Sequence, residues 1–242
     1  MQISQRMASL LEKKKKEIQN SCSKCHGVGC PICGGKFQFY LKMARAGVPP
    51  KFYEAELDQF DRCPPARKKI ESYVNKLDVF YEKGVGLYCY GSQGIGKSFC
   101  EAIIAKAALR KGYSVLYTTL SEIINQFGDG FYDKDIRDAY RREVLQVDFL
   151  IVDDIDKTLM NTEKSASFIS AAFDQLFRTR SNELLPTLFS ANKSREEFFK
   201  NSTGTFGASA LSLLAEHLVD VMFMGKDRRP QINSELVQLF GE

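Results

Sequence analysis

The stretch from Val85 to Arg110 constrains the fold of this chain more than any other. An apolar run, Val85 to Tyr90, leads into the glycine-rich sequence Gly91-Ser92-Gln93-Gly94-Ile95-Gly96-Lys97-Ser98, and a helical pattern follows from Phe99 to Arg110. The spacing GxxxxGKS between a strand and a helix is that of a phosphate-binding P-loop. Its glycines bring backbone N–H groups close to a polyphosphate, and the positive end of the helix faces the same anion. The pattern therefore predicts a nucleoside triphosphate site.

Two side chains of this motif have expected roles. Lys97 is expected to reach the β- and γ-phosphates, and the Ser98 hydroxyl is the expected Mg²⁺ ligand. An ordinary glycine-rich turn is the alternative, which the complete motif and both flanks disfavour. The expected nucleotide contacts are Gly91, Ser92, Gln93, Gly94, Ile95, Gly96, Lys97, Ser98, Phe99 and Asp153.

Polar residues follow two further apolar runs. Asp153 and Asp154 end the run from Val147, and Asn192 ends the run from Pro186. The carboxyl ends of parallel strands share one sheet edge, so these side chains are expected beside the P-loop. We assign Asp153 to Mg²⁺, Asp154 to activation of the attacking water and Asn192 to positioning that water. An asparagine after a strand is also a common turn residue.

Strand patterns alternate with helical patterns along most of the chain. The expected strands are 85–90, 114–119, 147–154, 186–192 and 218–224, and the expected helices are 66–82, 99–110, 120–127, 133–145, 162–180 and 194–200. This alternation predicts an α/β fold with a mostly parallel sheet and flanking helices. Near-continuous apolar runs such as 147–152 are typical of strands buried on both faces.

Four of the seven cysteines lie close together. Cys22, Cys25, Cys30 and Cys33 form a C-x2-C-x4-C-x2-C array, which predicts a closed structural zinc site. His26 is an alternative ligand because the spacer is short, and free thiols are the alternative to a metal. Residues 1–47 are therefore predicted to form a small zinc-binding docking module, followed by a linker at 48–65 and a main domain at 66–242.

The composition limits the class of protein. A chain of 242 residues can form one main domain with a small appendage. Its net charge of +4 is small against 34 basic and 30 acidic residues, so charge alone does not argue for nucleic-acid binding. No run of about 18 apolar residues occurs, which predicts no membrane span. We expect a soluble, intracellular protein.

The motifs together resemble a known family. The P-loop, the Phe149 to Asp154 strand, the Leu185 to Asn192 strand and Gly225 to Arg229 are similar to the AAA+ ATPases of the DnaC/DnaI helicase-loader and IstB group. The resemblance implies an AAA+ sheet without a full helical lid, and ATP hydrolysis with Mg²⁺. It also implies loading of a replicative hexameric helicase onto single-stranded DNA by an ATP-bound homo-oligomer. The zinc module resembles the helicase-docking region of DnaI-type and phage-type loaders, which act in the bacterial cytoplasm.

Two positions depart from the family pattern. Asp154 stands where many AAA+ proteins have glutamate. His217 stands where the family carries the arginine that reaches a neighbouring subunit's nucleotide. A neutral imidazole is a poor substitute for a guanidinium. The candidate trans-acting replacements are Arg180, Arg228 and Arg229.

A charged segment, Glu122 to Arg142, occupies the place of a helix that lines a single-stranded DNA path in relatives. The residues that fit such a path are Lys134, Arg137, Arg141, Arg142, Phe131, Tyr132 and Tyr140. Acidic residues lie between these residues and offset their charge, so an ordinary charged surface helix is an equally good interpretation of the segment. Other interpretations of the whole chain are an IstB-like transposition ATPase, an ATP-gated adaptor with little hydrolysis, and a small-molecule kinase.

Overall fold

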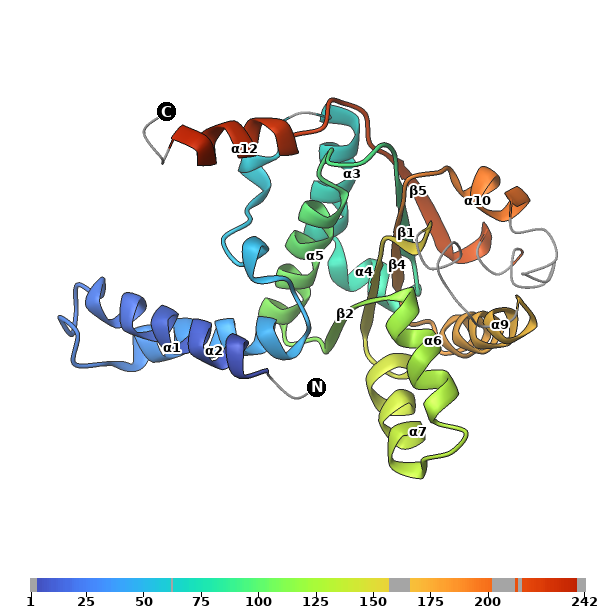
Figure 1. The fold of residues 1–242 in the computed structure, drawn as a ribbon, viewed down its shortest axis with the longest axis horizontal. Coiled ribbons are helices and arrows are strands. Elements are labelled where there is room, and N and C mark those ends of the chain that lie inside the picture. Colours follow the sequence, from blue (N-terminus) through green and yellow to red (C-terminus); the bar gives the residue numbers. More distant parts are fainter. Residues whose placement is uncertain (1–3, 62, 157–165, 202–211, 213–214, 239–242) are drawn as a thin grey trace.

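A single parallel sheet forms the centre of the protein in the computed structural model, which describes residues 4–61, 63–156, 166–201, 212 and 215–238. Its strands run in the order β2-β3-β4-β1-β5. Every paired neighbour is parallel, which confirms the predicted sheet (Figure 1). The strands are β1 (Gly86–Tyr90), β2 (Val115–Thr119), β3 (Phe149–Asp153), β4 (Thr187–Ala191) and β5 (Leu218–Met222).

Helices cover both faces of the sheet (Figure 1). One face carries α3 (Pro64–Asn75), α4 (Leu77–Glu82) and α5 (Lys97–Lys111), and the other carries α6 (Leu120–Asp129), α7 (Lys134–Tyr140), α9 (Ala166–Asn182) and α10 (Arg195–Asn201). The remaining helices are α1 (Gln5–Asn20), α2 (Pro31–Arg45), α12 (Arg229–Gln238) and short 3₁₀ turns at Pro50–Phe52 and Leu57–Gln59.

The strand residues alternate between two buried clusters. Leu87 and Cys89 of β1 face the α5 side, whereas Tyr88 between them faces the α9 side. The same alternation holds in β3, where Ile151 and Val152 belong to opposite clusters. Successive side chains of a strand point to opposite faces, so a sheet covered on both sides needs apolar residues at every position. The continuous apolar runs of the sequence reflect this double burial.

Several element boundaries differ from the sequence predictions. The predicted helix at 66–82 is two helices, α3 and α4, which meet at Lys76. The predicted helix at 133–145 continues from α7 as a π-helical turn, Arg141–Leu145. Helix α9 begins at Ala166 within the described part of the chain, and residues 162–165 of the predicted helix lie outside it.

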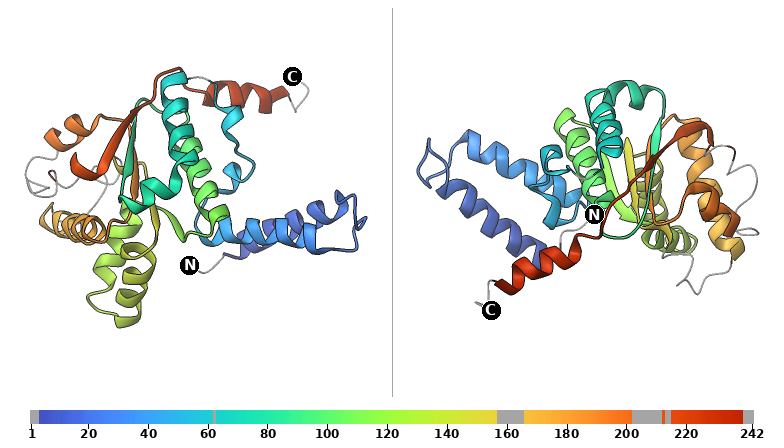
Figure 2. Two further views of the ribbon diagram at one scale, coloured as in Figure 1. Left: turned by 180° about the vertical axis from the view of Figure 1, so that it is seen from behind. Right: turned by 90° about the horizontal axis from the view of Figure 1, so that it is seen from above.

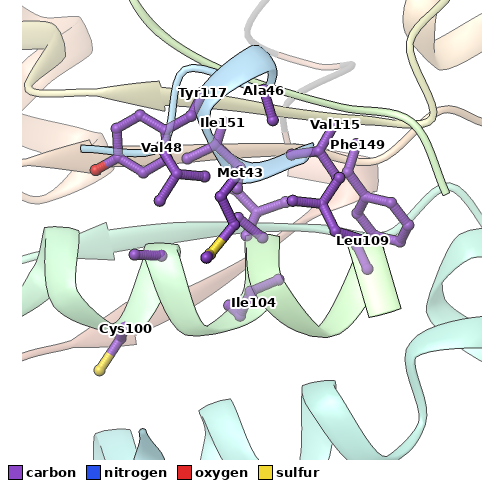
Figure 3. Close-up of a cluster of buried hydrophobic side chains, with 14 of the residues drawn as sticks. Met43, Ala46, Val48, Cys100, Ile104, Leu109, Val115, Tyr117, Phe149 and Ile151 are labelled. Atoms are coloured by element: carbon purple, nitrogen blue, oxygen red, sulfur yellow. The ribbon is translucent and has the colours of Figure 1, made fainter. Parts of the chain in front are cut away.

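The N-terminal helices form a hairpin that extends away from the sheet (Figure 2). The far end of α2 returns to the domain, where Met43, Ala46 and Val48 pack against Ile104 and Phe149 among others (Figure 3). Val48, Tyr53 and Phe60 of the predicted linker are also buried in this cluster. Residues 48–60 therefore pack as part of the core of the main domain. Within the described ranges, no helix is long and apolar enough to cross a membrane.

Arg180 of α9 is buried at the edge of the sheet opposite the P-loop. Its guanidinium donates hydrogen bonds to the carbonyls of Val144, Leu145 and Val147 at 2.8–3.1 Å, and to that of Pro186 at 2.8 Å. The Arg180 side chain is only 1% exposed. A guanidinium enclosed in this way cannot reach a neighbouring subunit. The prediction of a trans-acting role for Arg180 is therefore wrong, because tertiary packing places it inside the protein.

Replacement of this guanidinium should destabilise the fold. Arg180→Ala leaves several buried carbonyls without their donor, and we expect a loss of about 3 kcal/mol or more in the free energy of unfolding. Arg178→Ala is the matched control on the same helix. Arg178 is half exposed and pairs with Asp174 at 2.9 Å, so its loss should cost about 0.5 kcal/mol. Urea unfolding measures both, and equal losses would contradict the structural role of Arg180.

Candidate nucleotide-binding site

A cavity of about 490 Å³ lies at the carboxyl edge of the sheet. The P-loop, the start of α5 and the ends of β3 and β4 all contribute residues to its lining. The lining residues are Lys51, Phe52, Gln59, Phe60, Gln93, Gly94, Ile95, Gly96, Lys97, Ser98, Phe99, Asp153, Asp154, Ser190, Asn192, Arg228, Arg229 and Ile232. The structure thus brings the predicted P-loop, acidic and amide residues together in one cavity.

The P-loop backbone has the conformation that its glycines permit. Gly94 and Gly96 have φ values of 71° and 106°, a region that side chains other than glycine rarely adopt. A Cβ atom at Gly96 would also lie 2.8 Å from the ring of Phe60. Helix α5 begins directly after this turn, at Lys97, so its positive end faces the cavity. This arrangement suits a bound polyphosphate.

Lys97 is held within the loop. Its Nζ donates to the carbonyl oxygens of Gly91 at 2.6 Å and Ser92 at 2.8 Å, and to Asn192 Oδ1 at 3.1 Å. Burial lowers the pKa of Lys97, while nearby acids, Asp154 first among them, oppose that shift. Asn192 therefore lies within hydrogen-bond distance of the P-loop lysine. Its predicted place at this sheet edge agrees with the structure.

The Asp153 carboxylate accepts hydrogen bonds from three different elements. Ser98 Oγ of α5 donates to Oδ1 at 3.0 Å, and Ser190 Oγ of β4 donates to the same oxygen. Tyr117 of β2 donates its hydroxyl to Oδ2 at 2.9 Å. Hydroxyl and carboxylate oxygens are the ligands that Mg²⁺ prefers, so the Ser98 and Asp153 pair fits this ion.

Asp154 and Asp156 lie just beyond β3. Asp154 lines the cavity, and its backbone has a φ of 56°, which is unusual for a residue other than glycine. Its N–H donates to Ser190 Oγ at 2.9 Å. Asp156 accepts a hydrogen bond from the backbone N–H of Asn192, which links the ends of β3 and β4.

Glu101 lies one helical turn after Ser98 and is completely buried. Burial raises the pKa of Glu101 well above its usual range, and the neighbouring Asp153 carboxylate raises it further. Both effects favour the neutral, protonated form of Glu101 behind the phosphate site. Its position in an apolar helical pattern gave no sign of this role.

Arg228 and Arg229 line the cavity of their own chain. The backbone N–H of Arg228 donates to the Gly94 carbonyl at 3.1 Å, which brings the start of α12 onto the P-loop. Both arginines therefore lie beside the nucleotide cavity of their own chain, and a trans-acting role for them stays a prediction. Ile232 of α12 lines the same cavity. Within the described residues, α12 is the one helix after β5.

His217 precedes β5 at the opposite edge of the sheet from the P-loop. It lines a small cavity of about 10 Å³ together with Arg180 and Thr187. His217, which stands where the family pattern has an arginine, therefore lies next to the buried Arg180. The hydrogen bonds of Arg180 are all made to groups of this chain.

The four clustered cysteines lie at the tip of the α1–α2 hairpin, far from the nucleotide cavity (Figure 1). The Cys22–Cys30, Cys25–Cys33 and Cys30–Cys33 sulfur pairs are each 3.7 Å apart. A tetrahedron with zinc–sulfur bonds of about 2.3 Å has sulfur–sulfur edges of about 3.8 Å, so the geometry fits Zn²⁺.

Within the described residues, the cluster is the one group of three or more His, Cys, Asp or Glu side chains that could share a metal ion, and His26 is not a member. Backbone N–H groups of Cys33 and Ile32 lower the pKa of Cys30 to about 7, which favours its thiolate form. Helix α2 begins at Pro31, so Cys33 lies in its first turn. The second cysteine pair is thus part of a helix.

The basic segment of α7 and the following turn is a solvent-facing surface. Lys134, Arg137, Arg141 and Arg142 are exposed, and so are Phe131 and Tyr132, the latter at 96%. Tyr140 is only 4% exposed and packs inside the α9-side cluster. The prediction that Tyr140 stacks on a DNA base is therefore wrong, because the helix directs it into the core.

The sequence predictions missed the residues that hold the predicted ones in place. Ser190 and Tyr117 contact Asp153, yet they are 36 or more residues away in the sequence. Both hydroxyls lie in buried strands, but the sequence does not indicate which carboxylate they contact. Lys51, Phe52 and Phe60 of the predicted linker line the cavity, and no motif marks them.

Comparison with known proteins identifies the family. The model of the family described as "IstB-like ATP binding protein" matches residues 36–197. The chain belongs to this family. The matched range contains the P-loop, Asp153, Asp154 and Asn192.

Two curated relatives are helicase loaders. The replicative helicase loader DnaI of Bacillus subtilis (strain 168) is 29% identical over 146 residues, which are 59% of this chain and 45% of that protein. DnaC of Escherichia coli (strain K12) is 24% identical over 190 residues, which are 75% of this chain and 68% of that protein. The chain thus matches less than half of the DnaI loader.

Solved structures confirm the fold. The crystal structure of the DnaC helicase loader has a TM-score of 0.59 at 19% identity and covers 73% of this chain and 100% of that chain. The parallel sheet with flanking helices is therefore the AAA+ fold of the DnaC and DnaI proteins, and the expected resemblance to the DnaC/DnaI and IstB group is confirmed.

The buried Glu101 carboxyl should make stability depend on pH. Above the ordinary pKa of 4.5, the unfolded chain releases this proton more readily than the folded chain, in which the pKa of Glu101 is raised. The folded state then binds more protons, so stability falls as the pH rises, by up to about 1.4 kcal/mol per pH unit. Glu101→Gln removes this dependence. We expect the variant to gain stability over wild type at pH 8 more than at pH 5. Thermal unfolding at both values measures the gain, and a pH-independent difference would contradict the assignment.

Proposed function

We propose that this protein is an ATPase that loads a replicative DNA helicase onto single-stranded DNA. The observation that carries the proposal is the cavity in which the P-loop lysine, the Ser98 and Asp153 pair, and Asn192 meet. The similarity to DnaI and DnaC loaders supports the helicase as partner and the bacterial cytoplasm as the place of action.

Each residue of the site has a proposed task. Lys97 binds the β- and γ-phosphates, the backbone N–H groups of residues 91–98 cradle the same phosphates, and Ser98 and Asp153 hold Mg²⁺. Bound Mg²⁺ would neutralise charge that develops on the transferred phosphoryl group. Asp154 orients and activates the attacking water, and Asn192 positions it. Arg228 and Arg229, at the mouth of the same cavity, contact the nucleotide in cis.

The domain assignment remains part of the proposal. Residues 1–47 form the zinc-binding module that docks on the helicase, and 66–242 form the AAA+ domain. Residues 48–65 join the two, and residues 48–60 pack against the core of the AAA+ domain. The sulfur distances at the hairpin tip support a Cys22, Cys25, Cys30 and Cys33 zinc site that holds α1 and α2 together. Distance from the nucleotide cavity leaves this tip available to a partner.

Contact with single-stranded DNA is assigned to the exposed basic surface at Lys134, Arg137, Arg141 and Arg142. Phe131 and Tyr132 are exposed beside it and can stack on bases. ATP binding would assemble several copies of the chain on the helicase, and hydrolysis would release it.

An IstB-like transposition ATPase is the second candidate, because the matching family model carries that description. Co-purification with ATP separates the two. Recovery of a hexameric helicase supports the loader, and recovery of a transposase in its place contradicts it.

An ATP-gated adaptor is the third candidate, since His217 occupies the arginine position. Hydrolysis that DNA and helicase stimulate strongly would exclude the adaptor.

Loss of the P-loop ammonium should weaken nucleotide binding. We expect Lys97→Ala to reduce ATP affinity roughly 10- to 100-fold, because it removes charge-assisted hydrogen bonds of about 1.5–3 kcal/mol. Lys111→Ala is the control at the other end of α5, where Lys111 pairs with Asp78 on the surface. Calorimetric titration with ATP measures both. Unchanged affinity of the Lys97 variant would refute the nucleotide site.

Loss of two thiolates should release zinc and the helicase together. In the double variant Cys22→Ser and Cys25→Ser, we expect bound zinc to fall from one ion per chain to none. Helicase binding should decrease more than ATP turnover, because the cavity lies far from the hairpin tip. Ser23→Ala, an exposed change between the two cysteines, should keep the metal. Elemental analysis of purified protein tests this, and wild-type protein without zinc would reject the module.

A further inference from the structure

Tyr117 connects the magnesium ligand to the N-terminal hairpin. The Tyr117 hydroxyl donates to Asp153 Oδ2 at 2.9 Å, and its backbone N–H donates to the Ala46 carbonyl at 2.7 Å. Ala46 is the residue at which α2 ends. One residue of β2 therefore touches both the candidate active site and the end of the hairpin.

Strand register explains how Tyr117 reaches Asp153. In the β2–β3 pair, Thr119 lies opposite Asp153 and Tyr117 lies opposite Ile151. Tyr117 and Asp153 are thus diagonal neighbours on one face, a separation that an aromatic side chain spans. A shorter side chain at position 117 would leave Oδ2 of the carboxylate without this donor.

The ring of Tyr117 is fixed by its surroundings. The side chain is 5% exposed and belongs to the same buried cluster as Met43, Val48 and Ile151. Figure 3 shows the ring beside Val48, with the hydroxyl pointing out of the apolar cluster. A ring packed in this way has little rotational freedom, so it can hold the hydroxyl in one place.

The Asp153 carboxylate needs donors on both oxygens to keep one orientation. Ser98 and Ser190 both donate to Oδ1, and Tyr117 donates to Oδ2. Residues that orient a metal ligand without touching the metal typically change metal affinity 10- to 100-fold when they are removed. Tyr117 has the geometry of such a residue.

We propose that Tyr117 is a positioning residue that orients the Asp153 carboxylate for Mg²⁺, and that the end of α2 holds Tyr117 in place. The proposal rests on the nucleotide site described above and adds a physical link between that site and the zinc-bearing hairpin. Displacement of α2 by a partner would move the ring, and with it the magnesium ligand.

Tyr117→Phe in the full-length chain tests the positioning role, because it removes the hydroxyl and keeps the ring. A fluorescent ATP analogue is titrated first in EDTA and then at rising Mg²⁺. We expect the affinity for the analogue in EDTA to stay within about twofold of wild type. The Mg²⁺ half-point, which is the Mg²⁺ concentration that gives half of the maximal change in analogue binding, should rise roughly 10-fold or more. A wild-type half-point in the variant would overturn the positioning role.

Tyr73→Phe is the matched control. Tyr73 is also buried, and its hydroxyl donates to the Val85 carbonyl at 2.7 Å, away from the cavity. Both variants lose one buried hydrogen bond, so both should unfold at slightly lower temperature. Of these two variants, only Tyr117→Phe should change the Mg²⁺ half-point. An equal change in both variants would mean that general destabilisation causes it, and would overturn the proposal.

Val48→Ala tests the link to α2. It loosens the packing beside the ring and keeps the hydroxyl, so the Mg²⁺ half-point should rise by less than in Tyr117→Phe. Added to Tyr117→Phe, it should cause no further rise, because the two changes act through the same contact. An unchanged half-point in Val48→Ala, or independent effects in the double variant, would overturn the link.

The same titrations separate this proposal from the proposed function. Wild-type protein that binds no nucleotide, or binds it without any Mg²⁺ effect, would refute the nucleotide site and the role of Tyr117 with it. If wild-type protein shows a clear Mg²⁺ effect and Tyr117→Phe has the same Mg²⁺ half-point, the nucleotide site stands and only the role of Tyr117 is refuted.

Discussion

The Asp153 carboxylate is the group on which the arrangement of the candidate site depends. It ends β3 at the sheet edge, and it accepts hydrogen bonds from Ser98 of α5, Tyr117 of β2 and Ser190 of β4. A partly buried carboxylate is stable only when donors surround it. Because those donors come from three separate elements, the carboxylate fixes the positions of the P-loop helix and of both neighbouring strands of β3 at this edge.

At the opposite edge of the sheet, a positively charged side chain, Arg180, holds the strands together. Arg180 binds the carbonyls that precede β3 and β4, where a side chain from α9 reaches across the end of the sheet. Between the two edges, apolar side chains alternate between two buried clusters. Polar groups thus determine where the strands begin and end, and apolar burial on both faces holds the helices against the sheet. The candidate site is rigid because it is built on the ends of these closely packed strands and helices.

The segment after α2 belongs to both the hairpin and the cavity. Val48 packs beside Tyr117, while Lys51, Phe52 and Phe60 line the nucleotide cavity. A segment that resembles a linker in composition therefore acts as part of the ATPase core. This explains how a small hairpin with a cysteine cluster at its tip can be joined firmly to a nucleotide site, and it gives the proposed docking module a direct mechanical path to Asp153.

The sequence by itself determined the P-loop, the parallel α/β fold, the cysteine cluster and the positions of Asp153 and Asn192 at one sheet edge. These features depend on spacing within short segments and on the polarity of strand ends, which local sequence records. Only the tertiary structure decided that Arg180 and Tyr140 are buried, that Arg228 and Arg229 face their own P-loop, and that Tyr117, Ser190 and Glu101 surround Asp153. Those placements depend on the pairing of strands far apart in the sequence and on which face of each helix meets the core. No local pattern specifies contacts of that kind.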